Sequence, residues 1–208
     1  FGAGLTDSVV KAAQRNNIDV SVSDLRTATC PPLDPNGDTS WLRDYQQKAV
    51  DIALSQKNGL LWLPTGAGKT EIAIGLVNSV KCPWLFLVHR GVLATQAAER
   101  YRLRTGRHAA TIKNGKWICP HGQSRFTVAT FQTLWRHRKK PDVKLLLESI
   151  KGVIVDEAHV TAAKTFYKTL MKLKNAHYRI GLSGTPLQRT DNKAPFVVGA
   201  LGPPIYKL

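Results

Sequence analysis

The chain has 208 residues, of which 43% are hydrophobic, and no segment approaches the roughly 18 consecutive apolar residues of a membrane-spanning helix, so a helical membrane protein is excluded. Lys and Arg number 30 against 14 Asp and Glu, and the net charge of +16 favours a polyanionic partner, with a solvated basic surface or a place in a larger assembly as alternatives. Three scattered cysteines exclude a disulfide framework and indicate a reducing location, the cytoplasm or the nucleoid or host-cell interior.

Residues 1–38 are expected to form a small α/β appendage in front of the main domain. Residues 5–16 are compatible with a short helix and residues 18–22 with a strand, and a stretch rich in proline and glycine then breaks regular structure. Because so short a segment holds little core by itself, it either packs on the main body or is the remnant of a truncated domain, and we favour the remnant. The start at Phe1 and the abrupt end at Leu208 indicate a fragment.

Residues 39–208 are predicted to form one α/β domain. Five short apolar runs indicate buried strands: 60–63, 84–88, 127–129, 153–155 and 180–182. Apolar residues recur at helical spacing in the stretches 72–80 and 94–101. This alternation predicts a mostly parallel sheet with helices on both faces. Between these elements, Asn114-Gly115 favours a tight turn that joins two pairing strands.

A glycine-rich segment connects the first predicted strand to the helix that follows it. It reads Leu63-Pro64-Thr65-Gly66-Ala67-Gly68-Lys69-Thr70. Such a turn directs backbone N–H groups and the positive end of a helix to one spot, where phosphate oxygens can bind. We expect Lys69 to reach the β and γ phosphates of ATP and Thr70 to coordinate Mg²⁺. The general pattern G-x-x-x-x-G-K-[ST] has glycine at the position of Leu63, and a chance glycine-rich turn is the alternative.

An acidic pair, Asp156 and Glu157, follows the predicted strand 153–155. Ligands of open α/β sheets bind at the carboxyl ends of strands, where these side chains would lie. Asp156 suits a magnesium ligand, and Glu157 suits a group that orients or deprotonates the attacking water. A solvated loop or a helix cap is the alternative for an isolated acidic pair, but the lysine of the glycine-rich segment argues against it.

Four motifs stand in the order found in superfamily 2 helicases. They are Arg43-Asp44-Tyr45-Gln46, the loop 64–70, Asp156-Glu157-Ala158-His159 and Ser183-Gly184-Thr185-Pro186. Over residues 41–208 the chain therefore resembles the N-terminal RecA-like P-loop NTPase domain of this family, and in detail the DNA translocases of the phage UvsW type, excision-repair helicases and restriction-enzyme motor subunits. The resemblance implies an ATP-dependent enzyme that moves on DNA or remodels it.

The resemblance also implies roles for residues outside the phosphate loop. Gln46, helped by Arg43, would recognise adenine, because an amide can bond adenine N6 and N7 together, so ATP is expected to bind better than GTP. A surface glutamine is the alternative. His159, Ser183 and Thr185 resemble catalytic and coupling groups between the nucleotide and the nucleic acid, although an ordinary strand-to-turn segment would look similar.

Two further segments resemble the nucleic-acid track of the family. The implied contacts are His89, Arg90, Gln96, Thr130, Gln132 and Thr133. Hydroxyl, amide and guanidinium groups hold phosphates without reading bases, which suits movement along any sequence. Basic runs at residues 100–107 and 136–140 would widen this electrostatic footprint or simply be solvated.

DNA is the expected partner, and RNA is the alternative because RNA helicases share the same phosphate chemistry. A second RecA-like domain of the same parent chain is expected as well. Without the arginine fingers of that domain, worth roughly 10³ to 10⁵ in rate in related reactions, the chain should bind nucleotide and hydrolyse it very slowly. A non-catalytic nucleic-acid-binding module is a third interpretation, against which the intact Lys69, Asp156 and Glu157 argue.

Overall fold

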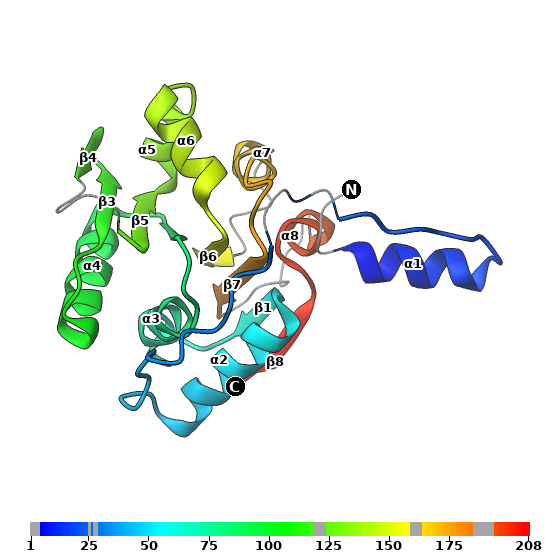
Figure 1. Cartoon of the computed structure of the whole chain (residues 1–208), viewed down its shortest axis with the longest axis horizontal. Helices are drawn as coiled ribbons and strands as arrows, with labels where there is room; N and C mark the ends of the chain where they lie inside the picture. The colour runs from blue at the N-terminus through cyan, green and yellow to red at the C-terminus, as the bar shows by residue number, and fades with distance from the viewer. Residues whose placement is uncertain (1–4, 25, 27–28, 119–123, 159–163, 185–193) are drawn as a thin grey trace.

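The computed structural model describes residues 5–24, 26, 29–118, 124–158, 164–184 and 194–208. Within these ranges eight strands form one sheet: β1 (Asn58–Trp62), β2 (Trp84–Val88), β3 (Ala110–Lys113), β4 (Lys116–Ile118), β5 (Phe126–Thr130), β6 (Gly152–Asp156), β7 (Tyr178–Ser183) and β8 (Pro204–Lys207). Their order across the sheet is β4-β3-β5-β2-β6-β7-β1-β8, and every neighbouring pair is parallel except β3 and β4 (Figure 1). The predicted, mostly parallel sheet is confirmed.

Alternate residues of the central strands belong to two separate hydrophobic cores. In β2, Leu85 and Leu87 pack in one core, whereas Phe86 and Val88 pack in the other. Successive side chains of a strand point to opposite faces of the sheet, so a strand that is apolar throughout must be covered on both faces. This arrangement explains why the predicted strands are continuous apolar runs rather than alternating ones.

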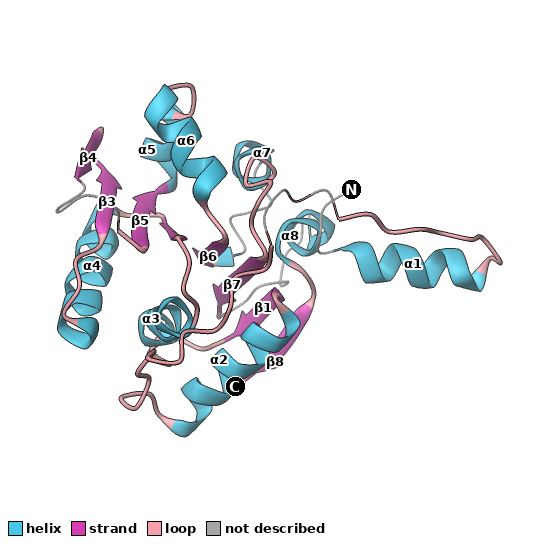
Figure 2. Cartoon of the chain, in the orientation of Figure 1, coloured by secondary structure: helices cyan, strands magenta, loops and turns pink. Residues whose placement is uncertain are grey.

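Helices cover both faces of the sheet, as predicted (Figure 2). On one face lie α2 (Asp44–Gln56), α3 (Lys69–Ser79) and α4 (Gly91–Thr105), and on the other α5 (Phe131–His137), α6 (Pro141–Ser149), α7 (Lys164–Leu170) and α8 (Ala194–Leu201). A further helix, α1 (Thr6–Arg15), projects away from the sheet in Figure 1. Among the described helices, none has the length and apolar character required to traverse a bilayer.

The predicted hairpin is confirmed and extends the main sheet. β3 and β4 pair antiparallel, with Lys113 opposite Lys116. Asn114 and Gly115 join them with φ of 51° and 75°, and positive φ at both central residues is typical of the two-residue turns that fit the twist of a hairpin. Because β3 also pairs in parallel with β5, the turn lies at the same edge of the sheet as the carboxyl end of β5.

The prediction of a strand at residues 18–22 is wrong. These residues form a loop, in which Ile18, Val20 and Val22 are 58%, 42% and 57% exposed. An alternating pattern produces a strand only where a neighbouring strand can pair with its backbone, and no described strand pairs with this segment. In the N-terminal segment the predicted helix is therefore confirmed as α1, whereas the predicted β component is absent from its described residues.

The segment before α2 is attached to the main body. Leu33 forms an antiparallel bridge with Val80, and Arg125 Nη1 lies 2.6 Å from Asp34 Oδ2. The proline-rich stretch thus contacts the end of α3 through a backbone bridge and the residue before β5 through an ion pair, in addition to connecting α1 to α2. A domain boundary after residue 38 stays a prediction.

Candidate active site and nucleic-acid interface

The glycine-rich loop and the acidic pair meet at one edge of the sheet. β1, β7 and β6 are adjacent and parallel, so their carboxyl ends lie side by side. The loop leaves the end of β1, Asp156 ends β6, and Ser183 ends β7 between them. Open α/β sheets bind ligands at this edge. The order of the strands therefore brings together motifs that are far apart in the sequence.

The phosphate loop has a backbone conformation that needs glycine. Gly66 and Gly68 have φ of 83° and 75°, in the left-handed region that side chains disfavour. A Cβ atom at Gly68 would also collide with the side-chain nitrogen of Gln46. Gly68 is the N-cap of α3, which begins at Lys69, so the first N–H groups and the positive end of the helix face the loop.

Leu63 occupies the position at which the general phosphate-loop pattern has glycine. Its side chain is fully buried, and its N–H donates to the carbonyl oxygen of Ser183 at 2.9 Å. Leu63 therefore prolongs the pairing between β1 and β7 and belongs to the core. The turn itself is made by the residues that follow, and the departure from the general pattern leaves it intact.

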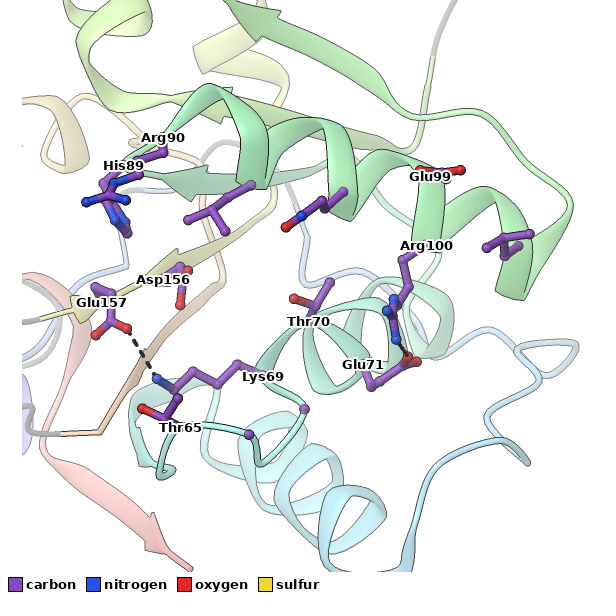
Figure 3. Close-up of a pocket in the computed structure, with 15 residues that line it drawn as sticks. Thr65, Lys69, Thr70, Glu71, His89, Arg90, Glu99, Arg100, Asp156 and Glu157 are labelled. Atoms are coloured by element: carbon purple, nitrogen blue, oxygen red, sulfur yellow. Dashed lines mark hydrogen bonds and ion pairs between the residues drawn. The ribbon is translucent and has the colours of Figure 1, made fainter.

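A pocket of about 720 Å³ opens at this edge of the sheet (Figure 3). Its walls include the loop residues Thr65, Gly66, Gly68, Lys69 and Thr70, the pair Asp156 and Glu157, and one side of α4. Lys69 Nζ donates a hydrogen bond to Glu157 Oε1 at 3.3 Å. Pockets of this size accommodate small ligands and cofactors. The structure thus brings four predicted site residues, Lys69, Thr70, Asp156 and Glu157, together in one cavity.

In the acidic pair, Asp156 has a raised pKa and Glu157 has a positive φ. Burial raises the pKa of Asp156 above its ordinary value, the negative charge of Glu157 raises this pKa further, and Lys69 opposes both effects. Glu157 has φ of 50°, which is uncommon for a residue with a side chain. Backbone strain of this kind is typical of functional sites. Two carboxylates held so close together favour a cation beside them.

Gln46 contacts the phosphate loop. Its Nε2 donates to the carbonyl oxygen of Ala67 at 3.1 Å, and its Oε1 accepts a hydrogen bond from the backbone N–H of Arg43 at 3.0 Å. Tyr45 Oη donates to the same Ala67 oxygen at 3.2 Å. Gln46 is buried, whereas Arg43 is exposed. Neither residue lines the 720 Å³ pocket. The structure thus shows Gln46 bracing the loop, and adenine recognition stays a prediction.

Four of the residues predicted to contact nucleic acid share a second pocket of about 330 Å³. His89, Thr130, Gln132 and Thr133 line it together with Gly91, Asn114, Gly115 and Arg136. Arg90 and Gln96 line the larger pocket instead, and His89 lines both. The predicted track is therefore divided between two neighbouring cavities. His89, which directly follows β2, lies in the wall of both cavities.

Ser183 is buried at the end of β7, between the strands that carry the phosphate loop and Asp156. Its coupling role stays a prediction. His159 and Thr185, the other two predicted groups of this kind, lie outside the described residues.

Sequence reasoning missed a buried acidic group next to the loop. Glu71, in the first turn of α3, accepts a hydrogen bond from Arg100 Nη1 at 2.7 Å and another from Arg104 Nε at 3.1 Å. Both arginine side chains pair with Glu71 and remain exposed to solvent, at 54% and 39%, and their part in a nucleic-acid footprint stays a prediction. No local pattern indicates this pairing, because the acid lies on α3 and both arginines lie on α4.

The fold and the site define a RecA-like P-loop domain, and the comparison with family models places it more narrowly. The model described as "Type III restriction enzyme, res subunit" matches residues 40–188, and the chain belongs to this family.

Two relatives and a solved structure agree with this assignment. The chain is 32% identical over 166 residues to the "DNA 3'-5' translocase XPB2" of Sulfurisphaera tokodaii, an alignment that covers 80% of this chain and 35% of that protein. It is 33% identical over 173 residues to the "Putative ATP-dependent helicase IRC3" of Saccharomyces cerevisiae, covering 74% and 24%. The UvsW helicase of bacteriophage T4 has the same fold, with a TM-score of 0.72, 22% identity, and coverage of 98% of this chain and 78% of that chain. The chain thus spans about a third or less of the length of the two relatives.

Proposed function

We propose that this chain is the ATP-binding motor domain of an ATP-dependent DNA helicase or translocase, which couples ATP hydrolysis to movement on DNA or to its remodelling. The observation that carries the proposal is the meeting of Lys69, Asp156 and Glu157 in one pocket, with 3.3 Å between Lys69 Nζ and Glu157 Oε1. The family and the names of the two relatives, a DNA translocase and an ATP-dependent helicase, support the same activity.

The positions of the side chains support a division of roles in hydrolysis. The backbone N–H groups of the loop and the Lys69 ammonium bind the β and γ phosphates. Phosphate oxygens compete with Glu157 for Lys69, so nucleotide binding weakens the ion pair seen in the structure. Glu157 then orients the attacking water and accepts its proton.

Thr70 and Asp156 are the residues proposed to hold Mg²⁺. Both line the same pocket, and a hydroxyl and a carboxylate supply the oxygen ligands that this ion prefers. The ion, when bound, neutralises charge on the phosphate oxygens. The raised pKa of Asp156 fits this role, because a carboxylate whose ionisation is disfavoured by burial and by Glu157 benefits from a neighbouring cation.

The proposal extends to partners outside the chain. We infer that a second RecA-like domain of the same parent chain completes the nucleotide site, which the greater length of the two relatives supports. Because the arginine fingers of such a domain are worth roughly 10³ to 10⁵ in rate, the isolated 208-residue chain binds ATP and hydrolyses it very slowly. Robust DNA-stimulated hydrolysis by the purified chain would contradict this inference.

A fluorescent ATP analogue tests the nucleotide site directly. The purified chain is titrated with the analogue with and without Mg²⁺, and Lys69→Ala is expected to abolish binding while the thermal unfolding curve stays unchanged. Lys48→Ala, on the exposed side of α2, is the matched control and should bind as the wild type does. Undiminished affinity in Lys69→Ala would show that the site is misplaced. Stimulation of hydrolysis by DNA or by RNA, measured on the parent protein, separates the DNA motor from the RNA alternative.

A further inference from the structure

Three adjacent parallel strands end in a row beside the proposed catalytic pocket. Ala129 pairs with Leu87 on β2 and with Ile112 on β3, so the ends of β3, β5 and β2 are level with one another. The residues at or just after these ends are Asn114, Thr130 and His89. Neighbouring strands are about 4.8 Å apart, so the row spans roughly 10 Å, and the hairpin turn forms its outer end.

The hairpin turn is fixed to the start of α4. Lys113 Nζ hydrogen-bonds Thr95 Oγ1, which joins the end of β3 to the second turn of the helix. The side chain of Asn114 lies against Gly91, where a Cβ atom would be only 3.3 Å from Asn114 Oδ1. These contacts hold the turn in place over the second pocket, which Asn114 and Gly115 help to line.

The 330 Å³ pocket has the chemistry of an anion site. Its walls carry amide, hydroxyl, imidazole and guanidinium groups, and neither an apolar side chain nor a carboxylate is among the described residues that line it. Arg136, in the last turn of α5, is exposed and supplies a positive charge. The Nδ1 atom of His89 is buried and has no hydrogen-bond partner among the described residues. Such walls suit a sugar–phosphate group, whose oxygens accept hydrogen bonds from amide, hydroxyl and guanidinium donors.

We propose that the turn Asn114-Gly115 and the side chain of Arg136 complete a sugar–phosphate site in this pocket, so that the β3–β4 hairpin is the outer wall of the path along which a DNA strand lies. The inference rests on the proposed function and adds to it an element that the family motifs leave out. Asn114 donates a neutral hydrogen bond to the backbone of the strand, and Arg136 contacts a phosphate. Recognition is independent of the base sequence.

Binding of labelled oligonucleotides to the 208-residue chain tests the inference. Anisotropy titrations use a single-stranded dT 20-mer, a dA 20-mer and an rU 20-mer over a series of salt concentrations. Asn114→Gly removes the amide and keeps a residue that tolerates the positive φ of the turn. Its matched control is Asn17→Gly, which makes the same change at φ of 53° on the loop after α1. Arg136→Gln is matched by Arg15→Gln, an exposed arginine at the end of α1 that lines neither pocket.

We expect Asn114→Gly to weaken binding of both DNA probes by about 2- to 10-fold without changing the salt dependence, because it removes a neutral hydrogen bond. Arg136→Gln should lower the slope of log Kobs against log salt by about 1, and the two controls should change neither quantity. Equal effects on the rU probe would extend the site to RNA strands.

Two results would overturn the inference in distinguishable ways. If Gln132→Ala weakens DNA binding while Asn114→Gly and Arg136→Gln match their controls, the hairpin is not part of the path and the proposed function stands. If the wild-type chain binds the ATP analogue but none of the oligonucleotides, the nucleic-acid part of the proposed function fails and the hairpin site fails with it.

Discussion

Lys69 Nζ and Glu157 Oε1 lie 3.3 Å apart, which connects the phosphate loop after β1 to the acidic pair at the end of β6 across the intervening strand β7. The two side chains are 15% and 31% exposed, so water screens their attraction only in part. This ion pair uses the same lysine that we propose to bind the phosphates of a nucleotide. Nucleotide affinity is therefore expected to depend on how strongly Glu157 holds Lys69.

Glu157→Gln should separate nucleotide binding from hydrolysis. Loss of the carboxylate charge releases Lys69, so the affinity for the ATP analogue is expected to stay the same or to rise several-fold. Hydrolysis by the parent protein should fall by about 10²- to 10⁴-fold, the usual contribution of a general base. Analogue titration and steady-state hydrolysis measure the two quantities. Glu99→Gln removes a charge from the α4 side of the same pocket and is the control, and weaker binding in Glu157→Gln than in Glu99→Gln would refute the competition.

Gln46→Ala tests whether this residue supports the loop or recognises adenine. Both ends of its amide are bonded to backbone groups, of Ala67 and Arg43, so we expect the loop to lose support. The free energy of unfolding should fall by about 1–2 kcal/mol, and the affinities for ATP and GTP should fall by the same factor. Urea denaturation and competition titrations measure these changes.

The neighbouring Gln47 provides the control for that substitution. Its amide bonds Asp51 on the exposed side of α2, so Gln47→Ala should leave both affinities unchanged. A selective loss of ATP binding in Gln46→Ala, with GTP binding unchanged, would show that Gln46 reads the base.

Glu71 makes the stability of the domain depend on pH. Burial by itself would raise the pKa of Glu71, but hydrogen bonds from Arg100 and Arg104 outweigh it, and the pKa lies below its ordinary value of 4.5. An acid whose pKa is lower in the folded state than in the unfolded state stabilises the fold fully at a pH above its unfolded-state pKa. This stabilisation is lost as the pH falls through the folded-state pKa. Glu71→Gln should therefore destabilise the domain by about 2 kcal/mol at neutral pH.

The difference in the free energy of unfolding between the wild type and Glu71→Gln should decrease as the pH falls below 4.5, because the protonated glutamate, like glutamine, carries no charge. Urea denaturation at a series of pH values measures it. Glu148→Gln, an exposed substitution on α6, should change the stability little at any pH. A difference between wild type and Glu71→Gln that is as large in acid as at neutral pH would contradict the role of the ion pairs.

Local patterns correctly predicted the elements whose conformation depends only on consecutive residues. The turn Asn114-Gly115 follows from the positive φ that asparagine and glycine tolerate, and the phosphate loop follows from a strand, two glycines and a helix that are consecutive in the chain. The strand predicted at residues 18–22 failed for the opposite reason. A strand needs a partner, and a local pattern says nothing about whether one is near.

Local sequence patterns were sufficient to predict the parallel α/β architecture and the chemical groups of the phosphate site, because apolar runs and the glycine-rich loop act over a few consecutive residues. Which distant groups meet became visible only in the folded chain. The tertiary structure placed Gln46 on the carbonyl of Ala67 and paired Glu71 with arginines of α4. It also set the hairpin turn beside Thr130. The order of strands in the sheet fixes these neighbours, and that order depends on the packing of the whole chain.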